Sequence, residues 1–148
     1  MNLSRRTTNA AALAILALGG TVAATAPASA ATPTSAAYNG ACGAGYYVQN
    51  WTDVKSSQTT VAGTVYVTYS LDTGKHCAVL VRTKPGTRVF MEVTLDTAPS
   101  SGAPERDYGS FTTYAGPVYL DVSKSDAQCM EWSGSVDIYY NSVQGLCS

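Results

Sequence analysis

The chain has 148 residues, with nine basic and ten acidic side chains and one histidine, so its formal net charge is −1. This length fits a single domain of common size together with a short targeting segment. Because the basic residues are few and scattered, the composition disfavours nucleic acid and anionic membrane surfaces as partners.

The N-terminal residues have the pattern of a secretory signal peptide. Arg5 and Arg6 provide a positive start, residues 10–24 are apolar and rich in alanine, and the small residues Ala28 and Ala30 suit a signal peptidase. The apolar stretch is too short to cross a bilayer, which takes about 20 predominantly apolar residues. Cleavage after Ala30 is therefore expected.

Three segments follow from that cleavage site. Residues 1–30 are the cleaved signal peptide, residues 31–37 are a flexible N-terminal segment of small and polar residues, and residues 38–148 form a single β domain. The loss of two arginines leaves seven basic and ten acidic residues, a formal charge of −3. We expect the mature protein to be secreted, without a membrane-integral part, and to be located outside the cell.

Beyond residue 31 the apolar side chains alternate at period two between turn residues, which is the pattern of β-strands. In 61–69, Val65 and Val67 share one face while Tyr66 lies on the other. The expected strands are 45–50, 61–69, 77–82, 89–95, 117–122, 129–132 and 136–140. Strands of this length and spacing predict an all-β fold, a small antiparallel β-sandwich or barrel of about seven strands.

Turn residues separate these strands. Residues 72–75 contain Gly and residues 84–87 contain Pro and Gly, which supply the backbone angles of tight turns. They predict two successive hairpins, the first between 61–69 and 77–82 and the second between 77–82 and 89–95.

The segment 96–110 is rich in Pro, Ser and Gly, a composition that does not continue a sheet. We expect it to be the longest loop and to cross the outside of the domain. Its part from Ala98 to Asp107 could present itself to a protease as an inhibitor loop. Pro117 suits the start of a strand or an edge strand, where no backbone donor is needed.

All four cysteines, Cys42, Cys77, Cys129 and Cys147, lie in the part that would be exported. In an oxidising compartment, four cysteines in a domain of this size predict two disulfides. Zinc binding is the alternative, but no two cysteines have C-x-x-C spacing and His76 is the only histidine. Three pairings are possible. We favour Cys42 with Cys77 and Cys129 with Cys147, because each pair joins neighbouring elements and the second ties down the C-terminus.

Residues that usually reveal catalysis are sparse. The chain contains no G-x-S-x-G, H-E-x-x-H or phosphate-binding glycine loop. Glu92 and Glu131 are candidates for the paired carboxylates of a glycosidase, and His76 for an acid or base in a small hydrolase or nuclease. Glutamates on the polar faces of strands are usually only solvated, and the sequence assigns no catalytic residue, cofactor or metal.

The chain has ten tyrosines, and Tyr66, Tyr119 and Tyr139 are all expected on the non-core faces of their strands. Side by side, they would form an aromatic platform for sugar rings, with the phenol hydroxyls free to hydrogen bond. Cross-strand aromatic pairs also simply stabilise a half-exposed sheet. The platform is therefore a hypothesis about a ligand site.

Several segments around the cysteines, taken together, resemble one known group. They are Ala37–Tyr46, Gly63–Tyr69, Thr73–Cys77, Tyr114–Tyr119 and Cys129–Gly134. In their order and spacing, and with the alanine-rich signal, these segments are similar to the spore-associated protein A family of filamentous actinobacteria. The resemblance implies a secreted protein found with spores or aerial growth, without an established enzymatic activity and without catalytic residues to assign.

These observations predict a secreted, non-enzymatic β domain held noncovalently on the spore or cell surface, with wall or extracellular glycan as a candidate partner. The alternative is a small secreted hydrolase or nuclease that uses Glu92, Glu131 or His76. One geometric test separates the two, because an enzyme needs two of these groups in one cleft.

Overall fold

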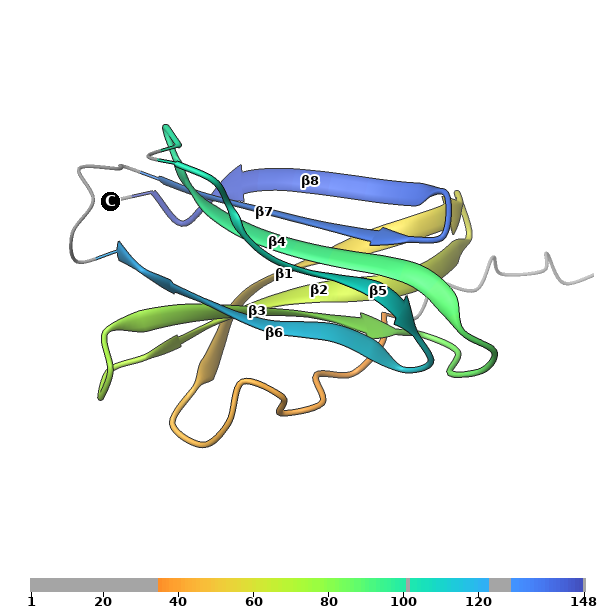
Figure 1. Ribbon diagram of the computed structural model, residues 1–148, viewed down its shortest axis with the longest axis horizontal. Helices are drawn as coiled ribbons and strands as arrows, with labels where there is room; N and C mark the ends of the chain where they lie inside the picture. Colours follow the sequence, from red (N-terminus) through yellow and green to blue (C-terminus); the bar gives the residue numbers. More distant parts are fainter. Residues whose placement is uncertain (1–34, 101, 123–128, 148) are drawn as a thin grey trace, which may run out of the picture. The chain divides into compact units, whose positions relative to one another are not determined.

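The computed structural model describes residues 35–100, 102–122 and 129–147, which form eight β-strands and no α-helix (Figure 1). The strands, in chain order, are β1 (Tyr47–Ser57), β2 (Thr60–Ser70), β3 (Lys75–Arg82), β4 (Val89–Ala98), β5 (Glu105–Phe111), β6 (Tyr114–Asp121), β7 (Cys129–Val136) and β8 (Tyr139–Gly145). The expected signal peptide, residues 1–30, lies outside the described residues, as do residues 31–34. In the described ranges, no helix has the length and apolar character needed to cross a membrane.

Two four-stranded antiparallel sheets pack against each other. One has the strand order β1-β2-β3-β6 and the other has the order β5-β4-β7-β8. Figure 1 shows them as two layers. The expected all-β antiparallel sandwich is therefore confirmed, with eight strands in the described ranges rather than about seven.

The core lies between the sheets and consists of the side chains that alternate inward. Trp132 of β7 is fully buried, and its indole N–H donates a hydrogen bond to Thr52 Oγ1 at 3.0 Å. The rest of the core cluster is Val54, Val65, Val67, Ala78, Leu80, Met91, Val93, Leu95, Ala115, Val118, Met130 and Val136. Val65 and Val67 point into this core and Tyr66 does not, as the alternation in the sequence predicts.

The first expected hairpin is confirmed and the second is wrong. β2 and β3 pair directly, with Tyr69 opposite His76. β3 then pairs with β6, whereas β4 lies in the other sheet between β5 and β7. Residues 83–88 therefore cross from one sheet to the other. Pro85 and Gly86 show that the chain turns, but their local backbone preferences do not decide which sheet the next strand joins.

The expected loop 96–110 is also wrong over most of its length. β4 continues to Ala98, and β5 pairs with β4 in antiparallel register. The connection is confined to residues 99–104, where the prolines of this region lie. β5 is an edge strand, and polar and charged side chains are typical of edges because they discourage pairing with another chain. The segment that could face a protease is accordingly shorter than Ala98–Asp107.

Hydrogen bonds join the two sheets at both margins of the sandwich. At one margin, Asp107 Oδ2 of β5 accepts a bond from the backbone N–H of Gly116 in β6 at 2.7 Å. Pro117 lies within β6, an edge strand as expected, although the strand starts earlier. At the other margin, Asn141 Nδ2 of β8 donates to the carbonyl of Asp53 in β1 at 2.9 Å. The strands of each sheet form backbone hydrogen bonds only within that sheet, so the fold is a sandwich rather than a closed barrel.

The expected strand 136–140 is wrong because a tight turn interrupts it. β7 ends at Val136, Asp137 and Ile138 form the turn, and β8 begins at Tyr139, which pairs with Val136. Asp137 has a left-handed backbone, with a φ of 57°, which Asp tolerates better than most residues. Ile138 is 81% exposed at the tip of the turn, so its place in an apolar alternation does not reflect burial.

Both favoured disulfides are present, Cys42–Cys77 and Cys129–Cys147. The first joins the N-terminal segment to β3, and the second joins the start of β7 to the residues after β8. They connect cysteines that are 35 and 18 positions apart in the sequence. By restricting the unfolded chain, each contributes about 3 to 4 kcal/mol to the free energy of unfolding.

The close contact of the sheets at Gly134 generates a test of the core. A Cβ at this position would overlap Val65 and would lie 3.3 Å from Val54 Cγ2 and 3.4 Å from Leu80 Cδ1. We expect Gly134→Ala to lower the free energy of unfolding by about 1 to 3 kcal/mol through overpacking, measured by urea denaturation. Gly86→Ala is the matched control, because nothing lies within 4 Å of a Cβ there. Equal midpoints for the two variants would contradict this account of the core.

Candidate functional site

The outer faces of the two sheets differ. Residues 35–46 (orange in Figure 1) run across the outer face of the β1-β2-β3-β6 sheet. Cys42, Cys77 and Val79 form a second buried cluster there, against which Tyr66 packs. We call this the covered face.

Hydrogen bonds hold the start of this N-terminal segment in place. Ser35 Oγ donates to Asp53 Oδ2 at 2.9 Å, and the backbone N–H of Ala36 donates to Thr64 Oγ1 at 3.0 Å. Thr64 Oγ1 in turn donates to Asp53 Oδ1 at 2.8 Å, and the Tyr66 hydroxyl donates to the Ala36 carbonyl. Ser35 and Ala36, the described residues at the start of the segment, are thus hydrogen-bonded to the sheet, whose donors and acceptors the segment's own composition does not reveal.

The structure does not bring Tyr66, Tyr119 and Tyr139 together. Tyr66 and Tyr119 belong to the covered face, where the Tyr119 hydroxyl donates to the Cys42 carbonyl at 3.2 Å. Tyr139 lies in the other sheet and packs against the core. The three rings therefore share no face, because β8 belongs to the other sheet. Within β8, the turn before the strand points Tyr139 toward the core, and Tyr140, which is 64% exposed, points outward instead.

The phenols of Tyr66 and Tyr119 on the covered face serve as hydrogen-bond donors. Burial raises the pKa of Tyr66, and the negative charge of Asp53 raises it further. Burial also raises the pKa of Tyr119, with added contributions from Tyr46 and Tyr38. Both hydroxyls therefore stay protonated at physiological pH and bond the carbonyls of the N-terminal segment.

His76 lies in β3, in a different sheet from Glu92 and Glu131. Its ring packs on Tyr69, with 4.7 Å between the ring centroids. Its Nδ1 is buried and has no hydrogen-bond partner within the described residues. Burial lowers the pKa of this imidazole, which favours its neutral form. The structure therefore separates His76 from both glutamates.

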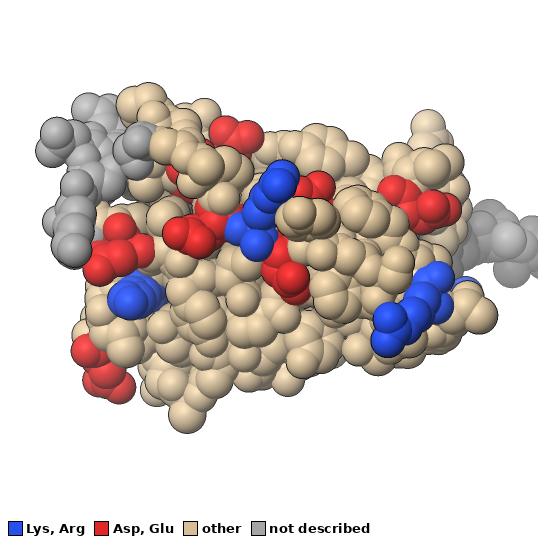
Figure 2. All heavy atoms as spheres, viewed as in Figure 1, with Lys and Arg blue, Asp and Glu red and all other residues tan. Residues whose placement is uncertain are grey.

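The outer face of the β5-β4-β7-β8 sheet, which we call the open face, exposes large aromatic side chains. Phe90, Tyr108 and Tyr140 are 46%, 54% and 64% exposed. Acidic side chains surround a basic one over β4 and β5 in Figure 2. The face also contains a depression of about 330 Å³. Its lining residues are Glu92, Thr94, Asp96, Pro104, Glu131, Ser133 and Tyr140.

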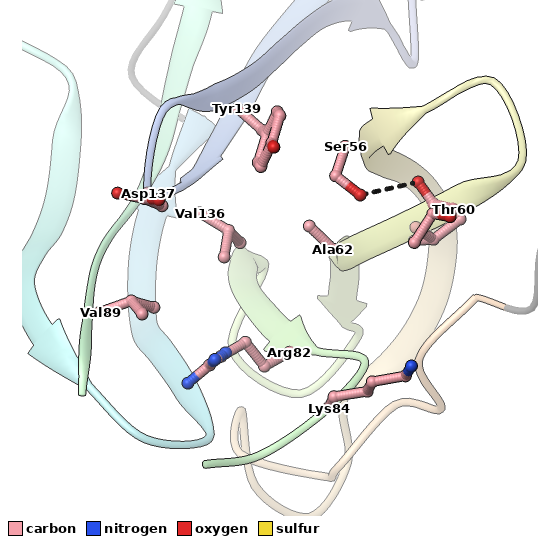
Figure 3. Close-up of a pocket in the computed structure, with 10 residues that line it drawn as sticks. Ser56, Thr60, Ala62, Arg82, Lys84, Val89, Val136, Asp137 and Tyr139 are labelled. Carbon is pink, nitrogen blue, oxygen red and sulfur yellow. Dashed lines mark hydrogen bonds between the residues drawn. The ribbon is translucent and has the colours of Figure 1, made fainter. Parts of the chain in front are cut away.

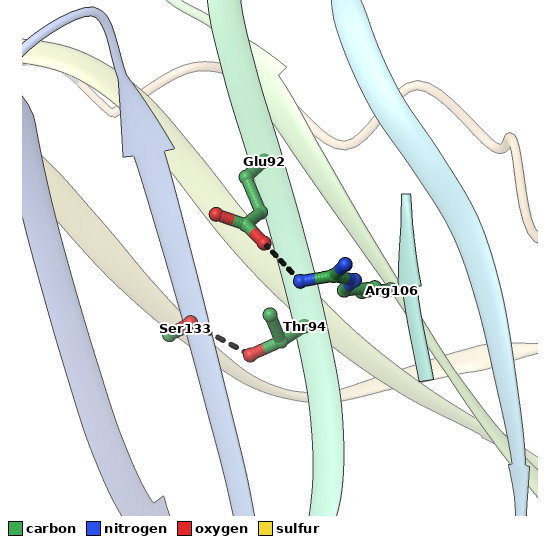
Figure 4. A network of polar contacts seen from close by, with 4 residues as sticks. All are labelled: Glu92, Thr94, Arg106 and Ser133. Atoms are coloured by element: carbon green, nitrogen blue, oxygen red, sulfur yellow. Dashed lines mark hydrogen bonds and ion pairs between the residues drawn. The ribbon is translucent and has the colours of Figure 1, made fainter. Parts of the chain in front are cut away.

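Glu92 and Glu131 both line this depression, so the structure brings together the two glutamates that the sequence singles out. Glu92 Oε1 lies 3.8 Å from Arg106 Nη1 (Figure 4). The Arg106 guanidinium lies over the ring of Tyr108, 4.5 Å from its centroid. Glu131 Oε1 accepts a hydrogen bond from Ser142 Oγ at 2.9 Å. Each carboxylate is thus held by a donor from the neighbouring strand.

Hydroxyl groups lie between these carboxylates on the open face. Thr94 Oγ1 and Ser133 Oγ share a hydrogen bond of 2.6 Å (Figure 4). Ser135 lies in register with Glu92 on one side and Tyr140 on the other. Its hydroxyl is buried and has no partner within the described residues, which leaves a donor and acceptor unused beside the depression.

This arrangement can recognise a molecule that is rich in hydroxyl or amine groups. Carboxylate oxygens accept hydrogen bonds from such groups, and the exposed rings offer flat apolar surfaces next to them. Among the residues that the structure describes, no three His, Cys, Asp or Glu side chains are grouped so that they could hold a metal ion.

Sequence reasoning missed Arg106, Tyr108 and Tyr140. The first two fall in the segment that was expected to be a loop, and the third falls beyond the unrecognised turn. The signal that could have revealed the first two is the alternation of Arg106, Tyr108 and Ser110 with smaller or inward residues along β5.

One curated protein provides a comparison. The chain is 39% identical over 125 residues to "Spore-associated protein A" of Streptomyces coelicolor (strain ATCC BAA-471 / A3(2) / M145), and the match covers 83% of this chain and 75% of that protein. No protein-family model and no solved structure matches the chain. The comparison thus rests on a relative that spans most of both sequences.

The buried imidazole of His76 predicts a pH dependence of stability. Because its folded-state pKa is lower than the ordinary value of 6.5, the unfolded chain binds more protons as the pH falls through that value. We expect the free energy of unfolding to decrease as the pH falls from about 7.5 to about 5. This pH-dependent decrease should be absent in His76→Gln. Urea denaturation of both proteins across this range measures it. The same pH slope in both proteins would contradict the assignment.

Proposed function

The chain belongs to the spore-associated protein A family, and on that basis we propose that it is an exported, non-enzymatic protein that adheres to the spore or cell surface by binding wall or extracellular glycan. The name of its relative supports association with spores. The presence of two disulfides is consistent with an oxidising, extracellular location. The observation that carries the proposal of glycan binding is the composition of the open face.

Three properties of the open face suit a sugar polymer. Tyr108 and Tyr140 expose more than half of their surface, and such rings stack on the C–H faces of sugars. Glu92 and Glu131 offer carboxylate oxygens to sugar hydroxyls in charge-assisted hydrogen bonds. Because the face extends over four strands, it can contact more than one sugar unit of a chain.

The contacts of the two glutamates support binding rather than catalysis. A glycosidase needs one carboxyl group that donates a proton and a second that acts as a base or nucleophile. Here Glu92 is paired with the Arg106 guanidinium, and Glu131 accepts a hydrogen bond from Ser142. Both carboxylates are therefore placed as acceptors, the role that sugar hydroxyls require of them.

A secreted glycoside hydrolase is the second candidate function. It is favoured by one observation, the presence of Glu92 and Glu131 in the same depression. That observation meets the geometric condition that a catalytic pair must share one cleft. A nuclease or hydrolase that also uses His76 is disfavoured, because this residue lies in the other sheet.

Removal of the two most exposed rings of the open face tests the adhesive role. We expect the double variant Tyr108→Ala, Tyr140→Ala to bind isolated spore walls about 30-fold more weakly, since each ring contributes on the order of 1 kcal/mol. Sedimentation with the walls measures bound and free protein. Tyr47→Ala is the matched control, because this ring is 66% exposed on the opposite sheet.

Unchanged binding of the double variant would rule out the open face as the adhesive surface. Detection of the mature protein only in the culture supernatant, and never with spores or walls, would sink the proposed surface role as a whole.

The hydrolase alternative makes an opposite prediction for the glutamates. If the protein only binds, the wild-type protein releases no reducing sugar from spore-wall polysaccharide, and Glu92→Gln and Glu131→Gln reduce wall binding by a few-fold through lost charge-assisted hydrogen bonds. Reducing-sugar release by the wild-type protein that both variants abolish would establish the hydrolase and overturn the non-enzymatic role.

A further inference from the structure

A cleft of about 320 Å³ opens at one end of the sandwich, where both sheets contribute to its lining (Figure 3). Val61 and Ala62 come from β2, Val89 from β4 and Val136 from β7. Val61 and Val136 are 4% and 5% exposed, so the walls of the cleft continue the apolar core toward the surface. The cleft shares no lining residue with the depression on the open face.

A fixed guanidinium lies at the mouth of this cleft. Arg82 Nη1 donates hydrogen bonds to the carbonyls of Thr87 and Thr112, at 2.8 Å and 3.2 Å. These neutral acceptors hold the group in place without neutralising it. In the described parts of the chain, no carboxylate lies within ion-pair distance of it, and the N–H groups on Nε and Nη2 remain available.

A second cation lies two residues further along the chain. Lys84 is exposed, lines the same cleft and forms no ion pair within the described residues. Figure 3 shows Arg82 and Lys84 on the same side of the hollow, with Ala62 and Val136 beyond them. Asp137 is the one carboxylate of the lining, so the described mouth keeps a net positive charge.

We propose that this cleft binds a single-chain anionic amphiphile, a fatty carboxylate, with its apolar chain between the sheets and its carboxylate at Arg82 and Lys84. Covering the apolar walls with an apolar chain instead of water lowers the free energy, because apolar surface is removed from water. A guanidinium held in position binds a carboxylate at low cost in conformational entropy, and the planar fork fits its two oxygens. This binding is independent of the open face.

Titration calorimetry with the full mature protein tests both halves of the ligand. We expect saturable one-to-one binding of decanoate, and at least tenfold weaker binding of acetate, which has the charge but no chain, and of decyltrimethylammonium, which has the chain and the opposite charge. Equal affinities for decanoate and decyltrimethylammonium, or the absence of saturable decanoate binding, would overturn the proposal.

Two variants test where on the protein the ligand binds. Lys84→Glu reverses an exposed charge, so it should leave the fold intact and weaken decanoate binding about fivefold, an effect that salt screens. Lys75→Glu, the same charge reversal at the opposite end of β3, is the matched control and should bind as the wild type does. Ala62→Leu fills the cleft and should abolish binding, with an unchanged urea midpoint showing that the protein remains folded.

Chemical-shift mapping completes the test. Decanoate should shift the methyl resonances of Val61, Val89 and Val136, which line the cleft. Shifts confined to residues of the open face, or full decanoate affinity in both Lys84→Glu and Ala62→Leu, would show that the amphiphile binds elsewhere and that the proposal is wrong.

Discussion

The inward packing of Trp132 is the constraint on which the open face depends. Its side chain is fully buried, it bonds Thr52 of the facing sheet, and a Cβ at Gly145 would lie 2.9 Å from its Cη2. The indole therefore sets both the spacing of the sheets and the position of β8. Because side chains alternate along a strand, an inward Trp132 places Glu131 and Ser133 outward, where they line the depression of the open face.

The two sheets expose different chemistry because the N-terminal segment covers only one of them. Residues 35–46 are anchored by the Cys42–Cys77 disulfide and by bonds to Asp53, Thr64 and Tyr66. The hydroxyls of Tyr66 and Tyr119 are thereby committed to the protein itself. The other sheet groups exposed aromatic rings with carboxylates and hydroxyls around one depression, and this grouping is why the proposed glycan surface lies there.

The open face and the end cleft differ in charge as well as in position. Three carboxylates and one arginine gather at the open face, which suits hydroxyl and amine groups. The cleft combines apolar walls with Arg82 and Lys84, which suits an anion with an apolar chain. Both sites follow from the sandwich architecture. The outer surface of a sheet is wide enough to contact a polymer, and the cleft between the ends of the two sheets can take up a single chain.

The sequence by itself determined the features that depend on local patterns. Period-two alternation identified most strands, and the four cysteines indicated two disulfides. Glu92 and Glu131, on the polar faces of their strands, were identified as candidate site residues. Which strands pair, and which face each residue takes beyond a turn, was decided only by the tertiary structure. The expected strand through Ile138 is interrupted by the two-residue turn at Asp137 and Ile138, which reverses the facing of the residues that follow. Tyr139 lies apart from Tyr66 and Tyr119 because β8 joins the other sheet. Alternation is a property of neighbours along the chain, whereas the presence of Glu92 and Glu131 in one depression depends on the pairing of β4 with β7 rather than with β3. That pairing is decided by the packing of the whole core.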